Sequence, residues 1–248
     1  MSERQRIDQL LVTTGRFDSR ARARAAIEAG LVRVSGRVVK KPSETFDAGA
    51  PIEAQAPHPW VSRAGLKLVA GLDAFSVDPA DAVCLDVGSS TGGFTQVLLS
   101  RGAAKVYAVD VGRDQLRASL RADARVVSME GRDARALEAS MFATLPRIIV
   151  CDASFISLKL ILPNVLPLAA QDATLVALIK PQFEAGRDNI GKGGIVKDES
   201  IHARVCDEIV ALVTQLGWRV EGVTPSPIEG GDGNKEFLMC AIRREASR

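Results

Sequence analysis

The sequence VCLDVGSSTGGF, residues 83–94, determines how the larger part of this chain folds. Its apolar beginning is typical of a buried strand that ends at Asp86, and its end leads directly into a helix. The glycines between the two allow a tight turn, and the free N–H groups at the helix start can bind a ligand. The spacing differs from GxGxxG, and the turn lacks the lysine of GxxxxGKS/T. Neither a dinucleotide site nor a triphosphate site is therefore the best fit.

Three more strand-like apolar runs along the chain end, like the first, at an ionisable residue. These residues are Asp110, Asp152 and Lys180. In an open parallel sheet the carboxyl ends of the strands line one crevice, and such folds bind their ligands there. The sequence therefore predicts that these charges, which are far apart along the chain, meet at a single active site.

Strands and helices alternate through the rest of the chain. Strands are expected at 83–87, 105–109, 126–129, 147–151 and 173–179, and helices near 94–101, 115–121, 157–168 and 199–216. The last two strands, about 219–224 and 236–242, are joined by a loop rich in Pro and Gly without room for a crossover helix, so we expect them to pair antiparallel. This pattern predicts an α/β fold with a Rossmann-like, doubly wound sheet and an antiparallel last strand.

The amino-terminal part has a different organisation, with two short helices followed by short strands. Asp18 or Ser19 can cap the second helix, and Ser35-Gly36 fits the turn of a hairpin. Two prolines near the end of this part favour an extended chain. We expect a small α+β domain at 1–54, a linker at 55–61 and the α/β domain at 62–248, which begins with a helix over 62–75.

Positive charge is concentrated near the amino terminus. The whole chain carries a net charge of +2, but residues 1–60 hold ten Lys and Arg against seven Asp and Glu. Between Arg16 and Lys41 there are eight basic residues and two acidic ones. Local basicity of this kind favours a polyanionic partner.

The chain shows neither a secretory signal pattern nor an apolar stretch approaching the ~20 residues that cross a bilayer. Its four cysteines have no CxxC spacing, and Cys84 and Cys151 lie in apolar strand runs, so we expect all four to be reduced and structural. His58, His202 and the isolated thiols form no metal-binding pattern, and no metal is expected. These features are typical of a cytoplasmic protein.

The pattern DxGxxxGGF at the first turn resembles the first motif of S-adenosylmethionine (SAM)-dependent methyltransferases. The predicted cofactor contacts in this motif are Asp86, Gly88, Ser89, Ser90, Thr91, Gly92, Gly93 and Phe94. Asp110 can accept hydrogen bonds from ribose hydroxyls. Asp133, past the third strand, can face the adenine edge or simply cap the helix that begins near Ala134. Taken alone, the glycines are equally consistent with an ordinary strand-to-helix turn.

Four residues from separate parts of the chain, Lys67, Asp152, Lys180 and Glu236, resemble the K-D-K-E tetrad of the FtsJ-type ribose 2′-O-methyltransferases. The blocks around them are similar to those of the TlyA family: VSRAGLK (61–67), DASFISL (152–158), KPQFE (180–184) and GNKE (233–236). This resemblance covers nearly the whole chain. Members of the family are known both as haemolysins and as ribosomal RNA methyltransferases.

The TlyA resemblance implies SAM-dependent methylation of the ribose of a cytidine in ribosomal RNA, in the large subunit and for some members also in the small subunit. By the same resemblance Lys180 is the general base, Asp152 orients it, and Lys67 and Glu236 adjust the charge and hold the ribose. Phe155, in the DASFISL block, would pack near the cofactor or in the core. For each tetrad residue alone, a salt bridge at a strand end without chemistry is the simpler interpretation.

Residues 19–36 match the pattern of the small alpha-L RNA-binding module first known from a small-subunit ribosomal protein. The predicted RNA contacts are Arg20, Arg24, Arg33, Arg37, Lys40 and Lys41. Scarce aromatics favour contacts with phosphates and folded RNA shape over base stacking. The alternative is a solvated charged face. The glycine-rich stretch 182–197, beside Lys180, could close over RNA as a lid or serve as a flexible connection.

Three other functions remain open on the sequence. The chain could be a non-catalytic RNA-binding or ribosome-assembly factor with a methyltransferase fold, which an absence of SAM binding would favour. A membrane-acting haemolysin is suggested by the family name alone, and no strongly amphipathic basic helix supports it. A small-molecule methyltransferase would have no evident need for a basic domain at residues 1–54. The sequence indicates neither the oligomeric state nor the nucleotide that is modified.

Overall fold

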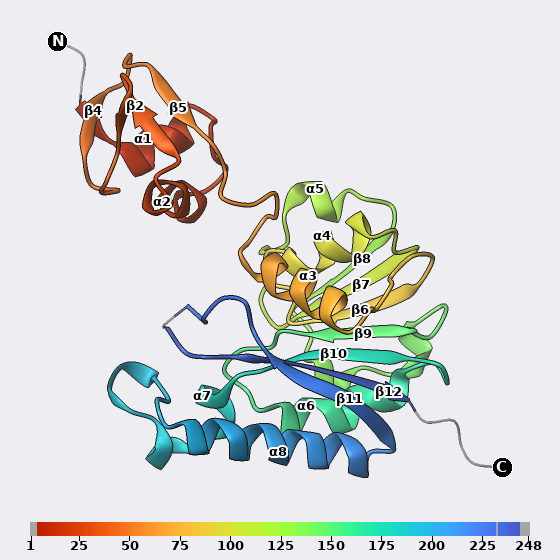
Figure 1. Ribbon diagram of the computed structural model, residues 1–248. Helices are drawn as coiled ribbons and strands as arrows, with labels where there is room; N and C mark the ends of the chain where they lie inside the picture. Colours follow the sequence, from red (N-terminus) through yellow and green to blue (C-terminus); the bar gives the residue numbers. More distant parts are fainter. Residues whose placement is uncertain (1–3, 232, 244–248) are drawn as a thin grey trace. The chain divides into compact units, whose positions relative to one another are not determined.

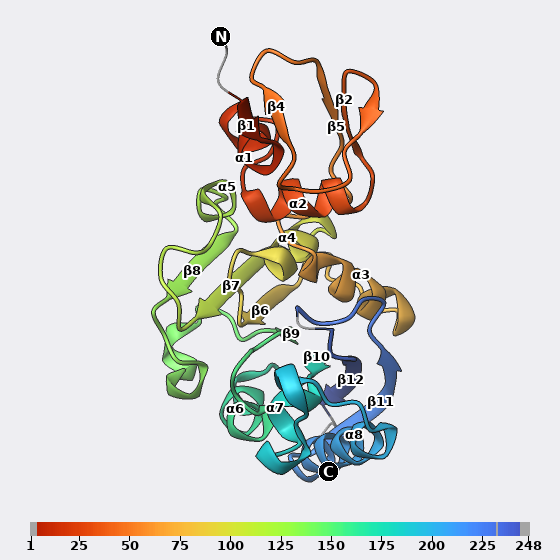
Figure 2. The ribbon, with the colours of Figure 1, turned by 90° about the vertical axis from the view of Figure 1, so that its left-hand side faces the viewer.

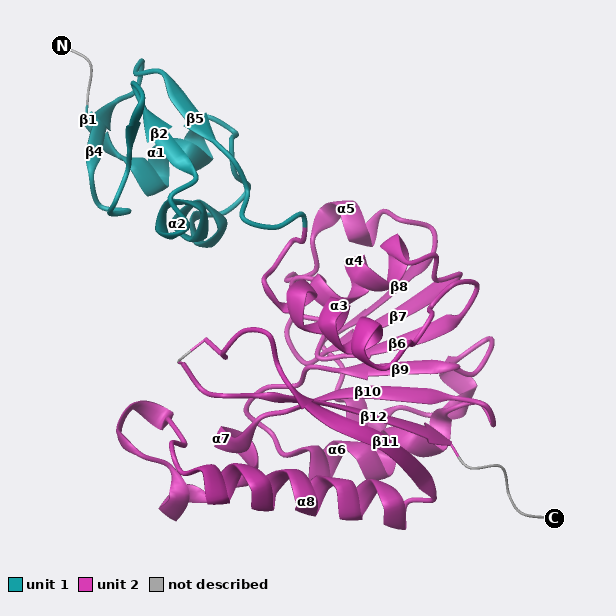
Figure 3. Ribbon diagram, in the orientation of Figure 1, with its two compact units in different colours: residues 1–59 teal, residues 60–248 magenta. Residues whose placement is uncertain are grey.

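The structure is a computed structural model that describes residues 4–231 and 233–243 (Figure 1). Two compact units divide the chain, Met1–Pro59 and Trp60–Arg248 (Figure 3). The segment expected as a linker, 55–61, contains this division. Each unit has a hydrophobic core of its own.

The first unit consists of two helices, a three-stranded sheet and a two-stranded sheet. Its elements are β1 (Arg4–Arg6), α1 (Ile7–Thr13), α2 (Arg20–Glu28), β2 (Val32–Val34), β3 (Arg37–Val38), β4 (Thr45–Asp47) and β5 (Ile52–Ala54). Ser19 caps α2, because its Oγ accepts a hydrogen bond from the Arg22 N–H. Ser35 and Gly36 both have positive φ, as a tight hairpin turn requires. The expected helices and hairpin are present, whereas the pair β1–β4 was not predicted.

The second unit is built around a seven-stranded sheet with the order β11-β12-β10-β9-β6-β7-β8. Its strands are β6 (Val83–Val87), β7 (Lys105–Asp110), β8 (Val126–Glu130), β9 (Ile148–Cys151), β10 (Thr174–Ile179), β11 (Trp218–Pro225) and β12 (Phe237–Arg243). β12 runs antiparallel to both of its neighbours, whereas the pairs from β10 to β8 are parallel. The predicted doubly wound sheet with an antiparallel last strand is confirmed.

Helices cover both faces of this sheet. One face carries α3 (Ala64–Ala74), α4 (Gly93–Ser100) and α5 (Ala118–Arg121), and the other carries α6 (Leu158–Val165), α7 (Pro181–Glu184) and α8 (Glu199–Gln215). Figure 2 shows α3 and α4 on one side of the sheet and α6 and α8 on the other. Successive strand residues alternate between the faces. Thus Cys84 packs in the core with α3 and α4, whereas Leu85 packs in the core with α6 and α8.

Two helices differ from the sequence prediction for local reasons. The helix expected over 115–121 is reduced to α5, because Gln115 and Leu116 donate their N–H groups to the carboxylate of Glu130 instead. The helix expected over 157–168 ends as an α-helix at Val165, and a short 3-10 turn follows it. The first change lies at the predicted active-site edge, because Gln115 lines a cavity there together with Asp110.

Candidate active site

Four charged side chains of the second unit form two ion pairs at the carboxyl edge of the sheet. Lys67 Nζ lies 2.5 Å from Glu236 Oε2, and these side chains are only 7% and 3% exposed. Lys180 Nζ lies 2.7 Å from Asp152 Oδ1. All four residues line one cavity of about 540 Å³, which we call the catalytic cavity after the role expected of these residues. The structure therefore brings together the four residues that the sequence singled out.

The topology of the sheet explains why residues so distant in sequence meet. Asp152 and Lys180 follow the neighbouring parallel strands β9 and β10, so both stand at the same edge. β12 is antiparallel to β10, and the start of β12 pairs with the end of β10. Glu236 therefore lies at this edge although it precedes a strand rather than following one. Lys67 reaches the same place from the buried face of α3.

The two pairs balance two positive against two negative charges that water hardly reaches. Removing one partner of a buried ion pair typically costs about 3–5 kcal/mol, because the other charge is left unpaired. Lys180 also donates hydrogen bonds to Ser154 Oγ at 2.8 Å and to the Asp152 carbonyl at 3.2 Å. Gln182 Nε2 donates to Glu236 Oε1 at 3.3 Å. Ser154 and Gln182 were not predicted, although both lie in the sequence blocks around the tetrad.

The loop before Glu236 is held by Asn234, which is buried and was not predicted. Its Oδ1 accepts a hydrogen bond from the Val196 N–H, and its Nδ2 donates to the Gly194 carbonyl, both at 3.0 Å. Gly194 lines the catalytic cavity. The glycine-rich stretch 182–197 is therefore tied to the loop that carries Glu236, and it forms part of the cavity wall.

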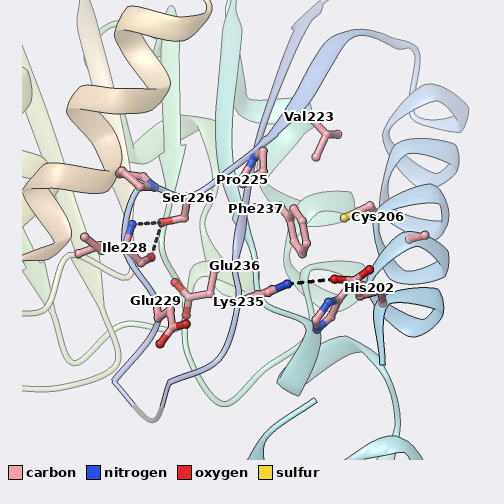
Figure 4. Close-up of a pocket in the computed structure, with 13 residues that line it drawn as sticks. His202, Cys206, Val223, Pro225, Ser226, Ile228, Glu229, Lys235, Glu236 and Phe237 are labelled. Carbon is pink, nitrogen blue, oxygen red and sulfur yellow. Dashed lines mark hydrogen bonds and ion pairs between the residues drawn. The ribbon is translucent and has the colours of Figure 1, made fainter. Parts of the chain in front are cut away.

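A second cavity, of about 620 Å³, lies between this loop and α8 (Figure 4). The buried His202 of α8 lines it, and its Nε2 lies 3.0 Å from the Val196 carbonyl. Lys235 Nζ lies 3.2 Å from Glu199 Oε1 at the start of α8. Glu236 lines both this cavity and the catalytic cavity, so it forms part of the wall between them.

The glycine-rich turn after β6 forms one side of a third cavity, of about 520 Å³, the glycine-turn cavity. Small-molecule sites typically measure about 300–1,000 Å³. Gly88 has a φ of +83°, and a Cβ there would lie 2.9 Å from backbone atoms of Ala153. Only glycine therefore fits at this point. Asp152 and Phe155 line both this cavity and the catalytic cavity, so the two adjoin each other.

Two carboxylates expected to face a cofactor line the glycine-turn cavity. Asp110 accepts hydrogen bonds from the N–H groups of Ser90 at 2.8 Å and Gly112 at 2.7 Å, which fix it at the end of β7. Asp133 caps a short 3-10 helix and pairs with Arg135 at 2.6 Å, and this contact lowers the pKa of its carboxyl. Asp133 therefore both caps this 3-10 helix and lines the glycine-turn cavity.

Asp86 lies inside β6 rather than at the end of the strand, because β6 continues to Val87. Its side chain is fully buried beside α4, where Thr95 Oγ1 donates a hydrogen bond to its Oδ2 at 2.6 Å. Burial raises the pKa of Asp86 to about 7. Asp86 does not line the glycine-turn cavity. The other members of the motif that do not line it are Ser89, Thr91, Gly92, Gly93 and Phe94.

Phe155 lies where the catalytic cavity and the glycine-turn cavity adjoin. Its side chain is 91% exposed, and its backbone has a φ of +65°. A left-handed conformation costs a residue with a Cβ roughly 1–2 kcal/mol. The ring centroid lies 5.3 Å from that of Phe183. The alternative that Phe155 belongs to the core is therefore wrong, and an exposed aromatic ring stands at the mouth of both cavities.

The six basic residues expected to bind RNA are all exposed on the first unit. Arg20 and Arg24 converge on the buried carboxylate of Asp8. Arg37 pairs with Glu44 at 2.7 Å. Two acidic residues, Asp8 and Glu44, therefore hold three of these six basic side chains in place.

The fold of the second unit defines a class of protein. A solved structure from Listeria monocytogenes, described as a candidate SAM-dependent methyltransferase, covers 72% of this chain and 100% of its own, with a TM-score of 0.53 and 14% identity. At that identity the likeness concerns the fold alone. The second unit has the fold of SAM-dependent methyltransferases.

Sequence similarity narrows this class. The FtsJ-like methyltransferase family matches residues 60–243, and the S4 domain matches residues 5–52. The 16S/23S rRNA (cytidine-2′-O)-methyltransferase TlyA of Mycobacterium tuberculosis is 42% identical over 250 residues, which cover 100% of this chain and 93% of that protein. This chain belongs to the TlyA family, in which an S4 domain precedes an FtsJ-like methyltransferase domain.

Two further relatives carry the name hemolysin. Hemolysin A of Brachyspira hyodysenteriae is 39% identical over 238 residues, which cover 96% of this chain and 99% of that protein. A solved structure of a candidate hemolysin from Streptococcus thermophilus covers 99% of this chain and 90% of its own, with a TM-score of 0.79 and 42% identity. In the part of the chain that the structure describes, no helix has the length and apolar character of a membrane span.

Proposed function

We propose that this chain transfers the methyl group of SAM to the ribose 2′-OH of a cytidine in ribosomal RNA, with the large subunit as a substrate. The observation that carries the proposal is the meeting of two buried lysine–carboxylate pairs in a cavity that adjoins the glycine-turn cavity. The name of the Mycobacterium tuberculosis relative supports the choice of nucleotide and of RNA.

The residues of the glycine-turn cavity fit SAM. Asp110 stands at the end of β7, the position where such sheets bind ribose hydroxyls, and its carboxylate is already fixed by two N–H groups. Gly88 lets the backbone approach a ligand closely. Asp133 offers an acceptor on the cavity wall for the adenine edge. When bound, SAM supplies a methyl group that its positive sulfonium already activates.

The chain's own residues have to orient the 2′-OH and take up its proton. In its neutral form Lys180 is the group placed to accept this proton, which turns its amine into the ammonium that pairs with Asp152. Asp152 and Ser154 hold its Nζ in position. Lys67 and Glu236 form the second pair on the cavity wall and are placed to hold the ribose. Positioned general bases contribute about 10²–10⁴-fold to rate, and orientation of the reacting groups contributes further.

Phe155 suits the target base. A nucleotide whose ribose enters the catalytic cavity leaves the RNA stack, and its base then needs a new stacking partner. Stacking on an aromatic ring is worth about 1–3 kcal/mol per base. The exposed ring of Phe155 at the mouth of the cavity offers such a surface, which also accounts for its exposure and its strained backbone.

Methylation of purified ribosomal subunits tests the proposal. With tritiated SAM and subunits from a strain that lacks the gene, wild-type protein should label the RNA of the large subunit, and mass spectrometry should locate a 2′-O-methylcytidine. The small subunit is assayed in parallel as a second substrate. SAM binding without labelling of either subunit would overturn the proposal and favour a non-catalytic RNA-binding factor.

A further inference from the structure

Asp8, in the first turn of α1, is a fully buried carboxylate surrounded by three guanidinium groups. Arg6 reaches it through Nε at 3.0 Å, Arg20 through Nη2 at 2.8 Å and Arg24 through Nε at 3.3 Å. Hydrogen bonding from Arg6 holds the pKa of Asp8 well below its ordinary value, so the group is ionised at neutral pH. These four residues, the Asp8 cluster, carry three positive charges and one negative charge.

The arginines of the Asp8 cluster are held on one side and open on the other. The side chains of Arg6, Arg20 and Arg24 are 39%, 50% and 51% exposed. A guanidinium has five N–H donors, and Arg20 and Arg24 each direct one hydrogen bond at Asp8. Within residues 4–231 and 233–243 neither has another hydrogen-bond acceptor. Most of their donors therefore remain available to a ligand.

A cluster that only joined α1 to α2 would be complete with fewer arginines. One carboxylate balances one guanidinium, whereas three guanidiniums around it repel one another. A second anion placed over the open side would relieve this repulsion. Phosphate oxygens match the fork of guanidinium donors, often with two parallel hydrogen bonds.

Fixed arginines also bind more tightly than free ones. Ordering a long side chain at an interface costs conformational entropy at the moment of binding. Asp8 already orders the side chains of Arg6, Arg20 and Arg24 in the unbound protein, so ligand binding loses less conformational entropy.

We propose that Asp8 assembles Arg6, Arg20 and Arg24 into a preorganised binding point for a phosphate of the RNA backbone. The inference rests on the proposed function, which makes RNA the substrate, and it adds Arg6 and Asp8 to the residues expected from the sequence. Its consequence runs against simple charge counting, because an acidic residue strengthens the binding of a polyanion.

The substitution Asp8→Asn tests the sign of this effect. If charge alone mattered, removing a negative charge from the basic unit would strengthen RNA binding. Loss of the ordering anion should instead weaken the binding of full-length protein to purified large ribosomal subunits about five- to tenfold. Glu53→Gln, which removes an exposed carboxylate from β5, is the matched control and should bind at least as tightly as wild type. Equal or tighter binding by Asp8→Asn would overturn the inference.

Methylation kinetics separate this inference from the proposed function. At saturating subunits Asp8→Asn should reach the wild-type kcat with a raised KM, since no residue of the cluster belongs to the catalytic cavity. A wild-type protein that labels neither subunit would overturn the proposed function. A wild-type protein that labels them, together with an unchanged KM for Asp8→Asn, would overturn only the Asp8 cluster as a phosphate site.

Arg24→Lys provides a second variant in case Asp8→Asn fails to fold. Arg24 is half exposed, and Asp8 keeps Arg6 and Arg20 when it is replaced. Lysine preserves the charge but lacks the planar fork, so binding should weaken about two- to fivefold. Arg16→Lys makes the same exchange at an exposed position outside the cluster and should leave the affinity unchanged. Wild-type affinity in Arg24→Lys would contradict the inference.

Discussion

The catalytic cavity and the Asp8 cluster are both built from basic side chains held by carboxylates, yet they differ in burial and in charge balance. In the cavity two lysines meet two carboxylates, and water hardly reaches them. In the cluster three arginines meet one carboxylate, and their outer sides are open. A balanced, enclosed arrangement suits the handling of one proton, whereas an unbalanced, open one suits a polyanion. Ion pairs can thus serve either a reaction or the binding of a ligand. The net charge of the group and its exposure to water decide which of the two it suits.

Removing the amine of Lys180 should have the largest effect on the enclosed side of this comparison. Lys180→Ala is expected to lower the single-turnover rate of methyl transfer by about 10²–10⁴-fold, because the base is lost. SAM affinity, measured by isothermal titration, should stay within about twofold, since Lys180 does not line the glycine-turn cavity. Lys105→Ala, at the amino end of β7, is the control. Retained turnover in Lys180→Ala would remove it as the base.

Breaking one pair in each region sharpens the contrast in stability. Lys67→Met leaves Glu236 buried without its cation and should lower the free energy of unfolding by about 3–5 kcal/mol. Arg24→Met should lower it by at most about 1 kcal/mol, because Arg24 is half exposed and Asp8 keeps two partners. Urea denaturation followed by circular dichroism measures both. Similar losses in the two variants would erase the distinction between enclosed and open ion pairs.

Asp86 adds a third arrangement, a buried carboxylate held by a hydroxyl instead of a cation. Its folded-state pKa of about 7 lies above the ordinary value of 3.8, so the folded protein holds the proton more tightly. This contribution to stability is present below about pH 4 and is lost as the pH rises through about 7. Asp86→Asn keeps a neutral hydrogen-bond acceptor for Thr95, and its side chain does not ionise, so the variant does not lose stability at this site as the pH rises. Relative to wild type, its free energy of unfolding should rise by about 2–3 kcal/mol between pH 5 and pH 8.

Asp78→Asn, which removes an exposed carboxyl of the same unit, is the control and is measured by denaturation at the same two pH values. Its stability relative to wild type should change little over this pH range. If Asp86→Asn and Asp78→Asn showed the same pH dependence, burial of Asp86 would not control the titration.

Phe155→Ala should have the smallest effect, since it removes one stacking surface and no charge. The KM for ribosomal subunits is expected to rise about five- to tenfold. Thermal stability should not fall, because the ring is exposed and its backbone conformation is strained. Leu160→Ala removes another exposed apolar side chain, on α6, and should leave KM unchanged. An unchanged KM in Phe155→Ala would exclude the ring from substrate binding.

The sequence predicted the second unit better than the first because its strands are long apolar runs. Buried runs such as 175–179 indicate strands directly, and the short Pro- and Gly-rich loop before β12 indicated an antiparallel pair. The strands β1 and β4, with the sequences RQR and TFD, contain no apolar run and were missed. The strand expected at 83–87 matches β6, but Asp86 was taken as its end because the apolar run before it stops there.

That Lys67, Asp152, Lys180 and Glu236 lie together could be predicted because they belong to recognisable sequence blocks, whereas the contacts that support them could not. Asn234 forms hydrogen bonds with backbone groups of Gly194 and Val196. Every residue has such backbone groups, so the sequence does not indicate which of them a side chain will contact. The ion pairs of Asp8 with Arg20 and Arg24 form because α1 packs against α2, which brings these arginines of α2 close to Asp8 of α1. Such convergence depends on tertiary packing and not on spacing.

β12 is the last strand in the part of the chain that the structure describes, yet it lies inside the sheet between β10 and β11. Lys67 precedes its partner Glu236 by 169 positions. During translation Lys67 is therefore synthesised long before Glu236, and it has no partner carboxylate until nearly the entire second unit has been made. A nascent chain that stops before β12 exposes the edge of β10 and has no complete site. The four residues of the site can therefore come together only after Glu236 and β12 have been synthesised.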